Sequence, residues 1–204
     1  MSMFLGPLDS AARVPPRQQT RLAAFLISAH GALARQLALA VPVHLRFGWE
    51  TELHAQFYRE TEIVSLLMHA TSWAPDPELP LFSLSWENAW LPKPAAGVTD
   101  WTQGLLIDTA AFGHALHAAI RPAALLPLEA SALDPFVVAL RRIEFESGRL
   151  MQAQILFLKS PQLLPVRDSV NAAVERRHAQ VRELWEAMLG SIGLRHDQPA
   201  SQQA

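Results

Sequence analysis

The sequence contains no cysteine among its 204 residues. This absence excludes disulfides, thiolate nucleophiles, zinc ribbons and iron–sulfur clusters together, and it is typical of a protein in a reducing compartment. Lysine is almost as scarce, because only Lys93 and Lys159 are present and arginine supplies the other basic residues. The formal net charge of -2 provides no basic field to neutralise a phosphate backbone. We therefore expect no nucleic-acid partner.

Long apolar runs are also missing. The longest stretches, Leu22–Ile27 and Leu37–Val43, are separated by polar residues. Each falls well short of the roughly 20 apolar residues that a membrane helix needs. Met1–Leu8 has no basic region of the kind that begins a signal peptide. These absences predict a soluble, cytoplasmic protein without a membrane partner.

Sequence motifs for catalysis are equally scarce. The chain has neither a Gly-x-Ser-x-Gly elbow nor a Gly-rich phosphate loop of the two common patterns. His114 and His117 are three residues apart on a predicted helix, which is a metal-ligand spacing. Both lie off the apolar stripe of that helix and no third ligand is near, so we interpret them as partly exposed and unliganded. We predict no catalytic residue, no metal and no cofactor.

An acidic cluster near residue 55 is the alternative source of acid–base chemistry. Charges beside strands more often form a solvated edge that discourages edge pairing, and we prefer that interpretation. The cluster consists of Glu50, Glu52, His54, Glu60 and Glu62.

Period-two alternation in the first half of the chain predicts strands. Residues 43–49 alternate apolar and other residues, and residues 81–90 place Phe82, Leu84, Trp86 and Trp90 on one face. Ser83, Ser85 and Glu87 occupy the other face of that strand and should be exposed. A second strand is predicted over 61–71, although its leucines also suit a helix, and a short one over 104–108.

Helices are predicted on both sides of these strands. The Ala- and Leu-rich segment 17–40 predicts a buried helix, and a helix from about 109 to 120 is stopped by Pro122. Asp134-Pro135 can cap a helix that runs to Leu158, because Asp accepts free N–H groups and Pro loses no bond there. A last helix covers about 166–189 after a turn at 161–165.

Together these elements predict an α+β fold. A small, mostly antiparallel sheet from about 43 to 109 would pack with an N-terminal helix and a C-terminal hairpin of long helices. Residues 1–16 are predicted to be a flexible lead-in, 17–193 a single globular domain, and 194–204 a disordered tail.

Two charged residues interrupt the apolar faces of the last two helices. Glu144 falls inside the apolar arc of the first and Arg177 inside that of the second. Because an unpaired buried charge is costly, we predict a salt bridge between them, with His178 as the alternative partner for Glu144. The alternative is that both side chains reach solvent at the edge of the interface.

Phe145 and Leu156 lie opposite the apolar face of the first of these helices. They are candidates for an interaction surface, so we predict a non-catalytic interaction, assembly or adaptor protein whose partner is another protein or a second copy. The six tryptophans support an alternative, since core packing accounts for most of them but some can line a ligand groove. In that alternative, the chain is a small-molecule-binding protein or enzyme with a Trp-lined pocket and a Glu or His as its acid–base group.

Overall fold

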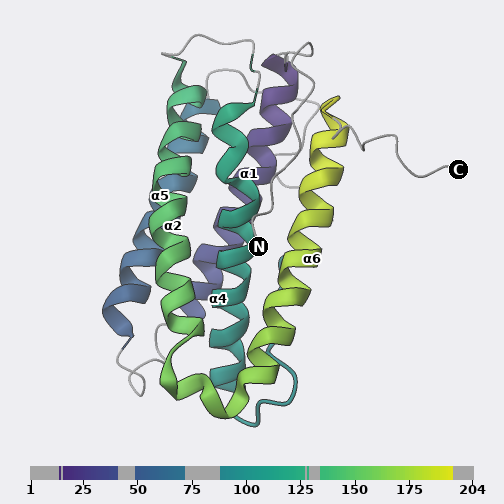
Figure 1. Cartoon of the computed structure of the whole chain (residues 1–204). Coiled ribbons are helices and arrows are strands. Elements are labelled where there is room, and N and C mark those ends of the chain that lie inside the picture. The colour runs from purple at the N-terminus through teal and green to yellow at the C-terminus, as the bar shows by residue number, and fades with distance from the viewer. Residues whose placement is uncertain are drawn as a thin grey trace, which may run out of the picture.

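The computed structural model describes residues 14, 16–40, 49–71, 88–126, 128 and 134–194. Within these ranges the chain forms five long α-helices and no strand beyond a single bridge between Val14 and Leu128 (Figure 1). The long helices are α1 (Pro16–Ala40), α2 (Glu50–Thr71), α4 (Trp101–Ile120), α5 (Pro135–Leu158) and α6 (Arg167–Ser191). Two 3-10 helices, η2 (Arg121–Leu125) and η3 (Pro161–Val166), follow α4 and α5.

Four of the helices close into a bundle. α1 packs on α2, α2 on α5, α5 on α4, and α4 returns to α1. The fifth helix, α6, lies outside this ring along α4, with a smaller contact to α1 (Figure 1). α5 and α6 therefore both pack along α4 rather than along each other. The interior of the bundle lies between α1, α2, α4 and α5. A groove lies between α5 and α6.

The predicted α+β class is wrong for the described part of the chain. Residues 61–71, predicted as a strand, belong to α2, and residues 104–108 belong to α4. The predicted strand at 43–49 and most of that at 81–90, with Phe82, Leu84 and Trp86, lie outside the described residues. Trp90 is buried as predicted, but it follows a helical turn at 88–89.

The position of α4 explains why its helical period is hidden in the sequence. α4 contacts α1, α5 and α6, so it is covered from several sides. Every residue from Gly104 to Thr109 is consequently buried, and no polar face interrupts the apolar run. A helix that is apolar all round produces the same short run as a buried strand.

Local capping signals predicted the other helices well. The predicted buried helix at 17–40 is confirmed by α1. The Asp134 carboxylate accepts the Phe136 N–H and Pro135 opens α5, which ends at Leu158 as predicted. α6 starts after the proline-bounded η3, close to the predicted position.

Two core residues lie at the predicted margins of the domain. Val14, placed in the lead-in, and Leu194, placed in the tail, are both buried in the main hydrophobic cluster. The stretch Gln18–Ala40 is long and apolar enough to cross a membrane by length and composition alone. In the structure, however, 78% of its most apolar window is buried inside the protein, where it forms the core helix of the bundle.

Candidate functional site

A polar cluster lies inside the four-helix bundle, with one residue from each helix. Glu60 of α2 accepts hydrogen bonds from His30 of α1, at 2.6 Å, and from His117 of α4, at 2.8 Å. The other ring nitrogen of His117 lies 3.2 Å from the Ser147 hydroxyl of α5. All four side chains are fully buried. We call this group the core cluster.

The ionisation of Glu60 is set by opposing effects. Burial raises the pKa of its carboxyl, but His117 and His30 outweigh burial through their charge and hydrogen bonds, and the pKa is lowered from 4.5 to about 2. The Nε2 atom of His30 has no hydrogen-bond partner among the described residues, whereas both nitrogens of His117 have partners. The core cluster is enclosed and its hydrogen bonds are used internally.

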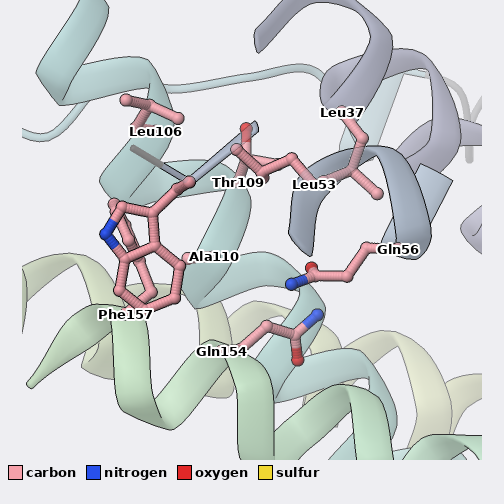
Figure 2. A pocket seen from close by; sticks show the side chains of 9 residues that line it. Leu37, Leu53, Gln56, Leu106, Thr109, Ala110, Gln154 and Phe157 are labelled. Carbon is pink, nitrogen blue, oxygen red and sulfur yellow. The ribbon is translucent and has the colours of Figure 1, made fainter. Parts of the chain in front are cut away.

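A small cavity lies further along the bundle axis, between the four helices (Figure 2). Its volume is about 10 Å³, which is room for one water molecule. Figure 2 shows the amide groups of Gln56 and Gln154 pointing toward one another. The Thr109 hydroxyl and the Gln154 carbonyl oxygen have no partner among the described residues. This cavity is too small for a substrate.

A second buried charge centre joins α4 to α6. Asp108 of α4 and Arg177 of α6 are both fully buried, and the guanidinium donates to both carboxylate oxygens. Arg176 donates to the same carboxylate at 2.8 Å. The Arg177 guanidinium also lies 5.0 Å from the ring centre of Phe112. All three Arg177 guanidinium nitrogens donate hydrogen bonds within the fold, whereas two arginines share the single Asp108 carboxylate and the buried Arg176 Nε has no partner among the described residues.

The same arginines hold an extended segment against the helices. Arg177 donates to the carbonyl of Leu91 and Arg176 to that of Lys93, while Asp108 accepts the Lys93 N–H. These bonds place Trp90 in the core, stacked on Phe112. The arrangement fixes chain conformation and leaves no open position for a ligand.

The predicted pair of Glu144 and Arg177 is not formed. Arg177 binds Asp108, and Glu144 is half-buried on α5 without a hydrogen bond or ion pair to the described residues. The physical reason is that α4 separates the two helices that were expected to form a packed hairpin. His178, the alternative partner, instead lies 2.7 Å from His114 of α4.

The groove between α5 and α6 contains an open cavity of about 280 Å³. Its polar lining comes from His114, Lys159, Arg167 and Asn171, and no acidic side chain of the described residues is part of the lining. Its apolar lining comes from Ile155, Leu158, Val170 and Val174. We call it the groove cavity. It is the described site that combines an opening, a ligand-sized volume and unmatched positive charge.

His114, which lines the groove cavity, and its neighbour His178 are held in their neutral forms near neutral pH. The pKa of His114 is lowered from 6.5 to about 4. Burial is the largest cause, and the positive charges of His178, His117 and Lys159 lower this pKa further. Burial and the positive charge of Arg182 also lower the pKa of His178. Near neutral pH one imidazole donates to the other. The positive charge of the groove cavity then comes from Lys159 and Arg167.

Other predicted site residues have different environments from those expected. His117 is fully buried rather than partly exposed, and Glu60 belongs to the core cluster rather than to a solvated edge. Phe145 and Leu156 are 59% and 57% exposed on α5. None of the described tryptophans lines the groove cavity. Trp90 and Trp185 pack in the core, and Trp49 lines the small axial cavity.

No group of three or more potential ligands is arranged to hold a metal ion within the described ranges. Comparison with protein-family models, with curated proteins and with solved structures gives no match for this chain. The geometry of the groove cavity is therefore the basis for a functional proposal.

Proposed function

We propose that this protein binds a small amphiphilic anion in the groove cavity. The observation that carries the proposal is the division of the cavity wall into a basic side and an aliphatic side. Lys159 and Arg167 supply two positive charges, while Val170, Val174 and Ile155 supply apolar contact. A carboxylate or similar anion with a short hydrocarbon chain matches both sides.

Helix α6 adds to the positive potential of this site. Arg167 and Val170 belong to its first turn, and its N-cap residue Val166 makes no side-chain capping bond. Asp168 of the same turn is exposed and is not among the lining residues. The N-terminal end of a helix carries partial positive charge, which favours an anion. Arg167 is held in place by its hydrogen bond to the Leu158 carbonyl at 2.9 Å. Part of the site is therefore preorganised.

The size of the cavity limits the ligand. A volume of about 280 Å³ is near the lower end for ligand pockets, so a ligand of modest size fits. The core cluster is fully buried and does not line the groove cavity, so the proposal is binding rather than catalysis. A cytoplasmic location, expected from the cysteine-free composition, is part of this proposal.

The test compares three six-carbon probes that differ in their head group: hexanoate, hexanamide and hexylammonium. We expect hexanoate to bind, by NMR titration or calorimetry, and hexylammonium not to bind. Lys159→Gln should weaken hexanoate binding about tenfold or more, since a hydrogen bond to a charged group contributes about 1.5–3 kcal/mol. Added salt should weaken it too.

Arg149→Gln is the matched control, because Arg149 is an exposed cation on α5 outside the cavity lining. This variant should bind hexanoate like the unmodified protein. Equal binding of hexanoate and hexylammonium would contradict the proposal. An equal loss of hexanoate affinity in Lys159→Gln and Arg149→Gln would contradict it as well.

A further inference from the structure

The outer side of α5 carries an exposed stripe that no described element covers. Val138, Phe145 and Leu156 are each more than half exposed. Arg141 and Arg149 are also exposed, and at about 100° per residue they fall in the same arc of roughly 80°. The stripe is therefore apolar and basic. We call it the α5 stripe.

The outer side of α6 has the opposite character. Glu175 and Glu183 are exposed there, and the small residues Ala172, Ala179 and Gly190 lie between and beyond them. These positions share an arc of roughly 80° on the helix. We call this acidic surface with small residues the α6 stripe. The two stripes lie on helices separated by α4 (Figure 1).

The stripes match residue by residue in one parallel register. When each α5 residue is aligned with the residue 34 positions later in the chain, Arg141 meets Glu175 and Arg149 meets Glu183. The same register places the apolar α5 residues opposite the small α6 residues. The three apolar pairs are Val138 with Ala172, Phe145 with Ala179, and Leu156 with Gly190.

We propose that the α5 stripe of one molecule docks on the α6 stripe of a second copy of this chain. Opposite charges select the register, and small residues let the two helices approach closely enough for Phe145 and Leu156 to pack. The register extends over 19 residues of each helix, or about 27 Å. This interface is independent of the groove cavity.

The contact joins two different surfaces, so its symmetry is heterologous. A molecule that uses its α5 stripe for one neighbour keeps its α6 stripe available for another. Association therefore continues into rings or open chains instead of ending at a symmetric dimer. Because the charged pairs lie at the rim and are exposed, added salt weakens the contact.

Sedimentation velocity over a range of protein concentrations tests this interface. At low salt we expect species heavier than the 22.6 kDa monomer, increasing with concentration. The double variant Arg141→Glu/Arg149→Glu should remain monomeric, as should Glu175→Arg/Glu183→Arg. All four residues are exposed, so circular dichroism melts of both variants should resemble that of the unmodified chain.

An equimolar mixture of the two double variants provides the decisive comparison. In the mixture every α5 stripe meets an α6 stripe of opposite charge, so the heavy species should return. A monomer at every concentration, assembly that persists in the separate variants, or a mixture that stays monomeric would overturn the proposal.

Discussion

At the scale of single residues, Glu60 is the group on which the core cluster depends. It is fully buried and accepts from His30 and His117 at the same time. In Glu60→Gln the amide loses the negative charge and replaces one acceptor oxygen with a donor. One buried imidazole then faces a donor, and the core cluster loses its negative charge. We expect the free energy of unfolding to fall by about 3–5 kcal/mol.

Urea denaturation of the variant measures this loss. The matched control is Glu52→Gln, which changes an exposed residue of the same helix. The control should stay within about 0.5 kcal/mol of the unmodified protein. If both variants lose equally little, the core cluster does not stabilise the fold as described.

The sequence pattern predicted one buried charged residue correctly but not the residue that pairs with it. The interruption of an apolar face pointed to Arg177, which is buried. Its partner Asp108 was missed because residues 104–108 were predicted as a short strand and not as part of a helix that packs on α6. Sixty-nine positions separate the two residues, and only the packing of α4 on α6 brings them together. No local pattern in the sequence predicts that α4 packs on α6.

At the scale of elements, Gly113 allows α4 to approach α5. A Cβ atom at this position would lie 2.2 Å from the Gln154 amide nitrogen. Because Gln154 is buried, its side chain cannot simply move into solvent. We expect Gly113→Ala to destabilise the protein by about 1–3 kcal/mol, despite the higher helix propensity of alanine.

Thermal melts of two further variants make this prediction specific. Gly148→Ala is the control, because a Cβ there meets nothing within 4 Å, and it should stabilise by about 0.5–1 kcal/mol. Adding Gln154→Ala to Gly113→Ala should remove the steric conflict. A Gly113→Ala melt that rises like that of Gly148→Ala would show that the two helices do not make this close contact.

The elements that sequence reasoning placed correctly are those with local boundary signals. Asp134-Pro135 fixed the start of α5, and Pro122 marked the end of α4. The misassigned elements lack such signals or a single apolar stripe. Leu105 to Ile107 are buried because neighbouring helices cover α4 from several sides, so helix and strand patterns become indistinguishable.

At the scale of the whole molecule, the lowered pKa values predict acid sensitivity in two stages. The pKa of His114 is about 4 in the folded protein against 6.5 ordinarily, so the unfolded chain takes up this proton first as pH falls. Stability present above pH 6.5 is therefore lost between 6.5 and 4. The lowered pKa of His178 acts in the same direction.

Glu60 produces the second stage. Its pKa of about 2, against 4.5 ordinarily, contributes about 3 kcal/mol above pH 4.5, and this is lost as the pH falls toward 2. Urea denaturation measured at a series of pH values from 6.5 down to 2 should show both losses of stability. His114→Gln should reduce the first stage and leave the second. A profile that His114→Gln does not change would contradict the assignment.

The groove cavity itself could not be predicted from the sequence. Its lining comes from three helices, and it exists because α5 and α6 diverge across α4 instead of packing together. The sequence favoured the packed hairpin, which would have filled this space. Lys159 and Arg167 flank the predicted turn, but nothing local indicates that they face a shared cavity.

A crystal structure with bound 6-bromohexanoate is the sharpest test of anion binding in the groove cavity, because the bromine atom can be located by its anomalous signal. We expect the carboxylate within hydrogen-bonding distance of Lys159 and Arg167, and the bromine beside the aliphatic wall formed by Val170 and Val174. A groove cavity that stays empty at concentrations where the probe binds elsewhere, or a probe bound with its carboxylate away from both cations, would contradict it.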